Sequence, residues 1–493
     1  MQKLYKSTRG SRVRLNLCEA ILKGLADDGG LFVPDFPLTH YEFEQLNQLS
    51  VLPYHELAAK IIGEFGDDDM REGIADACLK AYKTQSHFPE EVVPIRQVGD
   101  IHVAELFHGA TCAFKDIALS LLPHLMTFSL RYTREEREVM ILTATSGDTG
   151  KAALEGFSDV PGTRITVFYP DQGVSAVQKQ QMVTTTGNNV DVVAIRGNFD
   201  DAQRAVKEAF ADQSLQQAAD ASGVFLSSAN SINIGRLLPQ IVYYFYSYFN
   251  IVRAGGLNLG DEVNFCIPSG NFGNCLAGVI ARSMGLPVHR FIVASNTNNV
   301  LTDFFQNGTY DARREFHTTI APAMDILVSS NVERLLSMYG DTNATAERMK
   351  QLADEGHYSI SAAEQEVFAS LFFAGFQSRR QIDECIEQGF CKDHYVLDPH
   401  TAVGYGVLKD YQRTSGDTTS SILLSTASPF KFALDVLASI STLNVEEKDA
   451  ILLLHRKTNA EVPAPLADIF ERPVLHSTVI ERNEIIPYIK EKI

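Results

Sequence analysis

Several sequence signatures of common enzyme classes are absent from this chain of 493 residues. It has no HExxH motif of a zinc hydrolase and no GxSxG nucleophile elbow. It also lacks the GKS/T element of a P-loop and the GxGxxG fingerprint of a dinucleotide site. These absences argue against metal-dependent, serine-hydrolase, P-loop and dinucleotide-dependent chemistry, and we expect no metal.

Cysteine is scarce and apolar runs are short. The seven cysteines are odd in number, widely spread and never form a CxxC pair. This argues against a disulfide framework or a zinc site and favours a reducing, cytoplasmic location. The most aromatic stretch, residues 241–251, is much shorter than the roughly 20 apolar residues of a membrane span. We expect it to form a buried helix and expect no membrane association.

Positive charge is also in short supply. The chain has 43 lysines and arginines against 61 aspartates and glutamates, a formal net charge of −18. This balance argues against nucleic acids and anionic membranes as partners. An anionic small substrate would need a local cluster of hydrogen-bond donors. The length predicts two to four domains.

The pattern of apolar residues changes near residue 95. Residues 1–95 read as mainly helical, whereas strand-like apolar runs alternate with helix-like segments from there on. Such alternation is typical of an α/β fold with ligands at the carboxyl ends of parallel strands. We expect strands over 101–107, 139–144, 165–169, 190–195, 224–226, 263–268, 290–294 and 421–424. We expect helices over 116–132, 150–157, 176–185, 200–219, 234–249 and 273–284, and a polar, helical, peripheral insertion over 344–388.

The segment from Phe107 to Asp116 is the most informative stretch of the sequence. It places Lys115 where an expected strand gives way to an expected helix. A lysine at such a junction can bury its stem and face a cleft with its amine, as an enzyme needs to hold an aldehyde cofactor as a Schiff base. Taken alone, a lysine at this position is most often an ordinary surface lysine, and the rest of the chain is what favours a catalytic role.

Three loops follow expected strands and open expected helices. Residues 143–150 combine hydroxyls and glycines at a helix start, where free backbone N–H groups attract anions. The alternative for this loop is an N-cap with a tight turn.

The other two loops offer a phosphate site and a second anion site. Gly270 and Gly273 would let the backbone at 268–274 wrap a phosphate monoester, although a plain strand-to-helix turn is the alternative. Within 228–236, Arg236 lies among apolar residues near a helix start. Its guanidinium is either paired structurally or directed at an anion.

In combination, these motifs resemble those of the threonine synthases, pyridoxal-phosphate enzymes of the tryptophan-synthase β-like fold. The match covers nearly the whole chain and includes ELFHGATCAFKD (105–116), TATSGDTG (143–150), SSANSINIGR (227–236), PSGNFGN (268–274) and STASPFKF (425–432). The resemblance implies an α/β fold with two parallel-type sheets flanked by helices. We expect a mainly helical N-terminal domain (1–95), a large α/β domain (96–135 and 251–493) and a small α/β domain (136–250).

The resemblance also implies roles for individual residues. Lys115 would hold pyridoxal 5'-phosphate as a Schiff base and move protons. The cofactor would be bound further by Asp148 near its ring hydroxyl, by Thr426 at its pyridine nitrogen and, at its phosphate, by Ser269, Gly270, Asn271, Phe272, Gly273 and Asn274. The substrate would be held at its carboxylate by Ser146 and Thr149, and at its phosphate by Asn230, Ser231 and Arg236.

The implied activity is conversion of O-phosphohomoserine and water to L-threonine and phosphate, by γ-elimination and β-hydration, in a monomer or homodimer. Many relatives have proline and histidine where this chain has Ala110 and Ser428. Serine is a poor base near neutral pH, which argues against an acid–base role at position 428. Two alternatives stay open: a phospho-lyase that releases 2-oxobutyrate, ammonia and phosphate, and a non-catalytic relative that binds a ligand.

Overall fold

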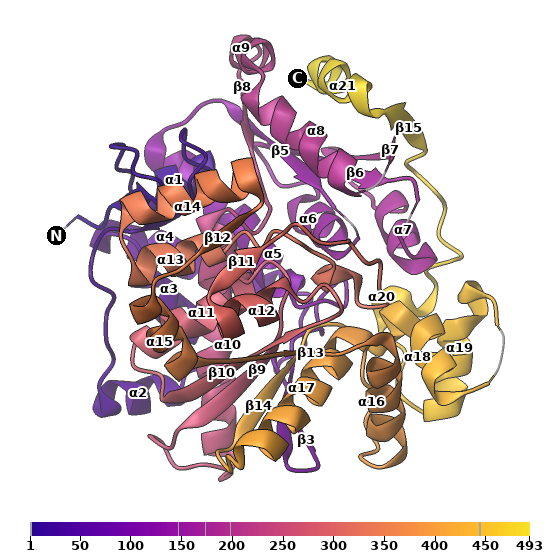
Figure 1. The fold of residues 1–493 in the computed structure, drawn as a ribbon. Coiled ribbons are helices and arrows are strands. Elements are labelled where there is room, and N and C mark those ends of the chain that lie inside the picture. Colours follow the sequence, from indigo (N-terminus) through magenta and orange to yellow (C-terminus); the bar gives the residue numbers. More distant parts are fainter. Residues whose placement is uncertain (1, 146, 173, 198, 443–444) are drawn as a thin grey trace.

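Two separate sheets, one of six strands and one of five, organise the chain (Figure 1). The computed structural model describes residues 2–145, 147–172, 174–197, 199–442 and 445–493. The larger sheet has the order β13-β10-β9-β14-β4-β3, and its neighbours are parallel except for β3 and β4. Its strands are β3 (Ile95–Val98), β4 (Ile101–Glu105), β9 (Val263–Pro268), β10 (Val288–Ser295), β13 (Phe372–Phe376) and β14 (Ser421–Ser425).

The smaller sheet has the order β15-β7-β6-β5-β8, and all its neighbours are parallel. Its strands are β5 (Glu138–Ala144), β6 (Thr163–Pro170), β7 (Val190–Arg196), β8 (Val224–Ser227) and β15 (Thr478–Glu481). Central strands such as β9 are buried throughout, as expected of parallel strands covered on both faces. The predicted fold class, parallel sheets flanked by helices, is confirmed.

Helices cover the faces of both sheets. The most buried is α10 (Ile234–Arg253), which is apolar over most of its surface and packs against α3, α5 and α11. The other main helices after residue 100 are α5 (Lys115–Thr133), α6 (Asp148–Phe157), α7 (Ala176–Val183), α8 (Phe199–Ala211), α9 (Gln213–Ala221), α11 (Gly273–Ser283), α12 (Val300–Asn307), α13 (Val332–Tyr339), α17 (Pro399–Ser415), α18 (Ala433–Ile440) and α19 (Glu447–Thr458).

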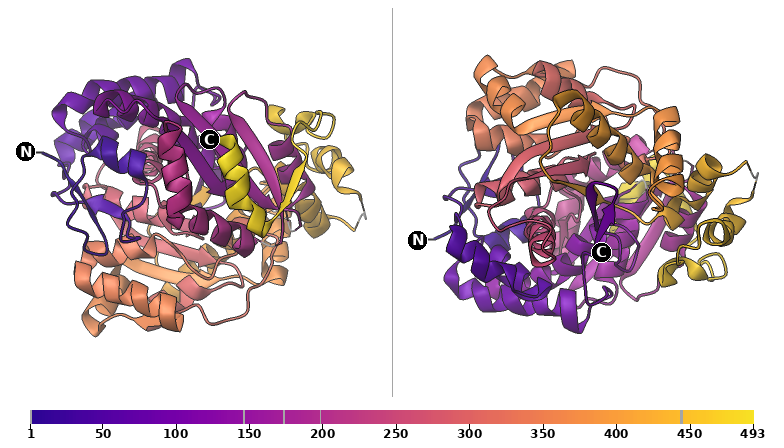
Figure 2. Two further views of the ribbon diagram at one scale, coloured as in Figure 1. Left: turned by 90° about the horizontal axis from the view of Figure 1, so that it is seen from above. Right: turned by 90° about the horizontal axis from the view of Figure 1, so that it is seen from below.

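The N-terminal region is mainly helical, as predicted, and also contains a short antiparallel pair, β1 (Tyr5–Ser7) and β2 (Phe32–Pro34). Its helices are α1 (Leu17–Lys23), α2 (Phe43–Ser50), α3 (Tyr54–Gly63) and α4 (Arg71–Leu79). They pack on α5 and α10, on the side of the molecule opposite α18 and α19 (Figure 2). In the part of the chain that the structure describes, no helix is long and apolar enough to cross a membrane.

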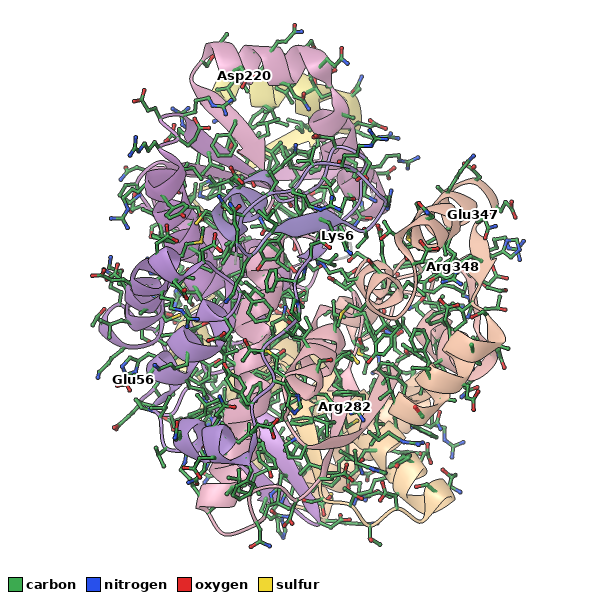
Figure 3. All side chains as sticks on the ribbon, turned by 90° about the vertical axis from the view of Figure 1, so that its left-hand side faces the viewer. Lys6, Glu56, Asp220, Arg282, Glu347 and Arg348 are labelled. Atoms are coloured by element: carbon green, nitrogen blue, oxygen red, sulfur yellow. The ribbon has the colours of Figure 1, made fainter. Side chains whose placement is uncertain are left out.

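The prediction of a helical insertion over 344–388 is incomplete, because two strands lie within it. The first, β12 (His357–Ser359), pairs with β11 (Thr309–Asp311). The helices α14 (Thr342–Glu355), α15 (Ala362–Leu371) and α16 (Arg379–Cys391) are present, and Figure 3 shows Glu347 and Arg348 of α14 on the side of the molecule away from Glu56. Between α15 and α16, however, β13 pairs with β10 as the edge strand of the larger sheet. This run has only five residues, too few to show a strand period within a helical context.

Two further boundaries differ from those expected. The single helix expected over 200–219 is divided, because Asp212 accepts a hydrogen bond from the N–H of Leu215 and so caps a new helix, α9. The strand β15, close to the C-terminus, joins the smaller sheet beside β7. The division of the chain into three domains stays a prediction.

Candidate active site

Lys115 is the first residue of α5, which follows the larger sheet's β4 and packs against α6, the helix after the smaller sheet's β5. The segment before it runs beside the end of β14: Leu106 donates its N–H to the carbonyl of Ser425 at 2.9 Å, and Phe114 to that of Thr426 at 2.8 Å. Cys112 has a φ of 60°, a left-handed conformation that turns the chain toward the helix. The local fold therefore fixes the position of Lys115.

The amine of Lys115 faces a carboxylate. Its Nζ lies 3.3 Å from Oδ2 of Asp148 and 5.2 Å from the centre of the Phe114 ring, and 11% of the side chain is exposed. Burial lowers the pKa of Lys115, and the positive charges of Lys431 and Arg236 lower it further, while Asp148 opposes them. An amine in this setting is a better nucleophile and base near neutral pH than an exposed lysine.

Asp148 comes from the start of α6, after the left-handed Gly147 (φ 143°). Its Oδ1 accepts a hydrogen bond from Nε2 of Gln178 at 2.9 Å and forms an ion pair with Nζ of Lys431 at 2.8 Å. Burial alone would raise the pKa of Asp148, but Lys431 and Lys115 outweigh it and hold the pKa well below its usual range. The carboxyl group is therefore an anion.

The turn before α6 is held by Thr145. Its Oγ1 accepts hydrogen bonds from the N–H groups of Gly147 and Gly150, at 3.0 and 2.9 Å. Thr149 is half-buried in the first turn of α6. Ser146, predicted to hold the substrate carboxylate, lies outside the described residues. The predicted loop is thus a strand-to-helix turn at the carboxyl end of β5, beside Lys115.

The loop after β9 carries polar atoms that are not paired. Both Oγ of Ser269 and Nδ2 of Asn274 are buried and have no hydrogen-bond partner among the described residues. A buried polar group left unpaired costs about 1–3 kcal/mol, so such atoms need an explanation. Hydrogen bonds to the oxygens of a bound phosphate would provide one, because a hydroxyl and an amide both donate to phosphate.

The same loop is packed too tightly to admit larger residues. An ideal Cβ on Gly270 would lie 2.5 Å from the carbonyl oxygen of Ala323. The backbone N–H of Ala323 in turn donates to Nε2 of His400 at 3.1 Å. Phe272 has a φ of 59° and directs the chain into α11, which starts at Gly273. The loop therefore packs closely against the backbone of residue 323 and leads directly into the start of α11, where N–H groups are free to bind an anion.

A third loop lies beside the second. The Oγ atoms of Ser231 and Ser330 are 3.3 Å apart, and Ser330 also lies 3.5 Å from Oδ1 of Asn271. Asn331 donates from Nδ2 to the backbone carbonyl oxygens of Ser231 and Asn271, at 3.2 and 3.0 Å. The loops at 228–236 and 268–274 are thus joined through residues 330 and 331.

Arg236 supplies a buried cation in this third loop. Its side chain donates from Nη1 to the carbonyl of Ala229 at 2.6 Å, and burial lowers its pKa to about 10. Over the residues that the structure covers, its Nε has no hydrogen-bond partner and no carboxylate forms an ion pair with it. The buried Oδ1 of Asn230 is likewise without a partner in the described ranges. A buried guanidinium without a counter-ion is a site for an anion.

Thr426 and Ser428 follow β14 and are buried. The carbonyl of Thr426 holds Phe114, the residue before Lys115, so Thr426 lies beside the amine-bearing turn. The Oγ of Ser428 accepts the N–H of Phe430 at 3.3 Å, and its N–H donates to the carbonyl of Cys112 at 3.0 Å. Ser428 therefore has a structural role in capping the short helix η4 (Pro429–Phe432).

The structure thus places Lys115 with Asp148, links Thr426 to the residue before Lys115, and joins the loops of Ser231 and Asn271. Lys431, which contacts Asp148, was missed by the sequence analysis. Its sequence signal was slight: it lies within the STASPFKF match, but nothing in the spacing pairs it with residue 148. Across the described residues, no group of three or more His, Cys, Asp or Glu side chains could hold a metal ion.

The residues present fit pyridoxal phosphate. A buried amine of lowered pKa matches an aldehyde, and the unpaired donors of Ser269 and Asn274 near a helix start match its phosphate. An acceptor or donor hydroxyl, as on Thr426, matches a ring nitrogen.

Comparison with known families agrees with this geometry. Three family profiles match in order: the threonine synthase N terminus at residues 4–82, the pyridoxal-phosphate dependent enzymes at 91–371 and the threonine synthase C-terminal region at 401–487. A threonine synthase of Pseudomonas aeruginosa is 39% identical over 95% of this chain and 94% of its own length. Human threonine synthase-like 1 is 36% identical over 94% of this chain, which spans 62% of that protein.

Solved structures give the same result. The pyridoxal-phosphate-bound threonine synthase of Brucella melitensis has a TM-score of 0.87 and 34% identity and covers 99% of both chains. The yeast threonine synthase also has a TM-score of 0.87, with 32% identity over 99% of this chain and 97% of its own. On sequence and fold together, this chain belongs to the threonine synthase family of pyridoxal-phosphate-dependent enzymes.

Proposed function

We propose that this chain converts O-phospho-L-homoserine and water to L-threonine and phosphate. One observation carries the proposal: the largely buried amine of Lys115 lies 3.3 Å from the carboxylate of Asp148, and the charge of a buried arginine, Arg236, in a neighbouring anion loop acts on it. A covalent aldehyde cofactor needs the amine, and a phosphorylated amino acid needs the second anion site. Family membership supplies the reaction class.

Pyridoxal phosphate, when bound, supplies an electron sink that stabilises negative charge on substrate carbon. We assign Lys115 to its aldehyde, Asp148 to the region of its ring hydroxyl and Thr426 to its pyridine nitrogen. Its phosphate is assigned to the loop of Ser269, Gly270, Asn271, Phe272, Gly273 and Asn274. A neutral hydroxyl such as that of Thr426 leaves the ring nitrogen largely unprotonated, which restrains side reactions.

Substrate binding is assigned to the two remaining loops. Ser146 and Thr149, at the start of α6, would hold the substrate carboxylate, because N–H groups at a helix start favour anions. Asn230, Ser231 and Arg236 would hold the substrate phosphate. The guanidinium of Arg236 gives the charge-assisted hydrogen bonds that a phosphate prefers.

Lys115 is assigned the proton transfers. Its amine takes the proton from the substrate α-carbon and then helps to remove one from the β-carbon. Phosphate leaves from the γ-carbon, which then takes up a proton to become the methyl group. Water adds its hydroxyl at the β-carbon, and a proton returns to the α-carbon. Each transfer requires the amine to change its protonation state, which the lowered pKa of Lys115 makes easier near neutral pH.

The test is incubation of the purified protein with pyridoxal phosphate and O-phosphohomoserine, with phosphate, threonine and 2-oxobutyrate measured in the same tube. We expect equal amounts of phosphate and threonine. Phosphate with 2-oxobutyrate would identify a phospho-lyase on the same site. Release of neither product, together with no absorbance from protein-bound cofactor, would identify a non-catalytic relative.

We further propose a cytoplasmic location and a monomer or homodimer without nucleic-acid partners. All seven cysteines are free, which suits a reducing compartment, and the net charge of −18 disfavours polyanions. Light scattering on the purified protein measures its mass directly, and a trimer or larger assembly would contradict the proposal.

A further inference from the structure

Lys431 is a second lysine beside the proposed catalytic amine. It lies in η4, and its side chain is completely buried. Its Nζ forms an ion pair with Oδ1 of Asp148 at 2.8 Å and donates to the carbonyl oxygen of Thr111 at 2.8 Å. A buried ammonium group is costly unless it is paired, so its pairing with Asp148 defines its place in the fold.

Two lysines therefore share one carboxylate. Oδ1 of Asp148 contacts Lys431 and Gln178, and Oδ2 contacts Lys115. Because Oδ1 already has two partners, the orientation of the carboxylate is fixed and Oδ2 is directed at the catalytic amine. The positive charge of Lys431 also offsets the negative charge that Asp148 would otherwise place next to the cofactor ring.

We propose that Lys431 is a positioning residue, which holds Asp148 toward Lys115 and places a positive charge that offsets the negative charge of Asp148 beside the Lys115 nitrogen. The inference rests on the proposed function. Without Lys431, a lone Asp148 would stabilise the protonated form of Lys115 by direct attraction.

The charged groups around both lysines are consistent with this role. Lys115 faces Asp148, Lys431 and Arg236, in addition to the Phe114 ring. Two positive neighbours thus act against one negative neighbour. Arg236 is assigned to the substrate phosphate and will be neutralised by it, whereas the contacts of Lys431 are with Asp148 and the backbone of Thr111, neither of which is assigned to substrate.

The surroundings of Lys431 include two more ionisable groups. Asp116 is buried and accepts hydrogen bonds from the N–H and Oγ1 of Thr111, and burial raises its pKa. Burial also raises the pKa of the Cys112 thiol to about 12. These two pKa shifts leave the ion pair between Lys431 and Asp148 in place, and Asp148 is the charged group in direct contact with Lys431.

The test compares neutral and charged replacements of Lys431 in the holoenzyme. Lys431→Gln keeps a hydrogen-bond donor, Lys431→Met keeps the length and needs no partner, and Lys431→Arg keeps the charge. Lys151→Gln is the matched control, because Lys151 is also buried in an ion pair, with Glu155 at 2.7 Å, but does not contact Asp148.

The readout is a pH titration of the absorbance of the protein-bound cofactor, which reports protonation of the nitrogen contributed by Lys115. We expect the midpoint to rise by about one pH unit, a tenfold change in proton affinity, in Lys431→Gln and Lys431→Met. Lys431→Arg and Lys151→Gln should keep the wild-type midpoint. Circular dichroism shows which variants fold. The test can be read from either neutral variant, Lys431→Gln or Lys431→Met, provided that it folds.

An unchanged midpoint in a folded neutral variant would overturn the inference, as would an equal rise in Lys431→Arg. The wild-type protein separates this failure from that of the proposed function. If wild type binds the cofactor and forms threonine but the Lys431 variants titrate normally, only the role of Lys431 is lost. If the wild-type protein neither binds the cofactor nor forms threonine, the proposed function itself fails.

Discussion

Nζ of Lys115 and Oδ2 of Asp148 meet at 3.3 Å although their helices begin at different sheets. Lys115 starts α5, which follows β4 of the larger sheet, and Asp148 starts α6, which follows β5 of the smaller one. The two helices pack directly: a Cβ on Gly156 would lie 2.1 Å from the carbonyl oxygen of Leu119. The packing of α5 against α6 therefore brings the amine and the carboxylate together.

Replacing the amine gives the first prediction. Lys115→Ala should lose threonine formation to below detection, because no other group in the assigned chemistry carries out the proton transfers. It should also lose the absorbance band of the protein-bound cofactor. Phosphate release and the absorption spectrum are the measurements, with Lys448→Ala, an exposed lysine, as the control. Retention of both activity and an unaltered band would remove Lys115 from the reaction.

Asp148 gives a prediction about stability. Asp148→Asn leaves two buried lysines without their shared carboxylate, so the cofactor-free protein should lose about 3–5 kcal/mol of unfolding free energy at pH 7. The pKa of Asp148 in the folded protein lies below the ordinary value of about 3.9. The stabilisation by Asp148 is therefore present above that value and lost as the pH falls through the folded-state pKa.

Urea unfolding between pH 7 and pH 3 tests this sign. The difference between wild type and Asp148→Asn should stay constant down to about pH 4 and shrink at lower pH. A difference that grows on acidification would show that the carboxyl group is protonated in the folded protein.

Arg236 gives a prediction about substrate affinity. Arg236→Ala removes a charge-assisted partner of the substrate phosphate, a loss of about 1.5–3 kcal/mol, so KM for O-phosphohomoserine should rise about tenfold to a hundredfold. In Arg236→Lys, KM should rise less, because the positive charge is kept and only the planar, two-pronged donor geometry of the guanidinium is lost. Steady-state kinetics give KM, and competitive inhibition by inorganic phosphate should weaken in parallel. An unaltered KM in the alanine variant would place the phosphate elsewhere.

Much of the framework could be predicted because it depends on local pattern. The expected strand over 263–268 is observed with the same bounds, and the helix expected to start at Asp116 starts at Lys115. Mostly apolar runs such as 263–268 and the loop motifs next to them are visible in sequence without knowledge of tertiary contacts. The anion loops were found for the same reason, since glycines and hydroxyls at a helix start have a local cause.

What could not be predicted depends on contacts between distant segments. Lys431 reads as an ordinary lysine in sequence. Its contact with Asp148, 283 positions away, requires the fold to bring η4 beside the first residue of α6 and the turn at Thr111. The edge position of β13 is likewise set by pairing with β10 and not by its own five residues. Tertiary context of this kind overrides local propensity.

The hydroxyl of Ser269 gives a prediction in which stability and cofactor binding move in opposite directions. This Oγ is buried, and the described part of the chain offers it no hydrogen-bond partner. Ser269→Ala removes an unpaired polar atom, so the cofactor-free protein should be as stable as wild type or more stable, by up to about 1–3 kcal/mol. The same change removes a donor to the cofactor phosphate and should weaken cofactor affinity about tenfold or more.

Ser247→Ala is the matched control for that prediction. Ser247 is buried in α10, and its Oγ is also without a partner among the residues described, but it lies outside the three loops. Its replacement should change stability in the same direction and leave cofactor affinity unaltered. Urea unfolding of the cofactor-free proteins and titration with pyridoxal phosphate measure the two quantities. Equal affinity in Ser269→Ala and wild type would mean that the unpaired hydroxyl is a packing defect and that the phosphate is held by the backbone N–H groups of residues 270–274 alone.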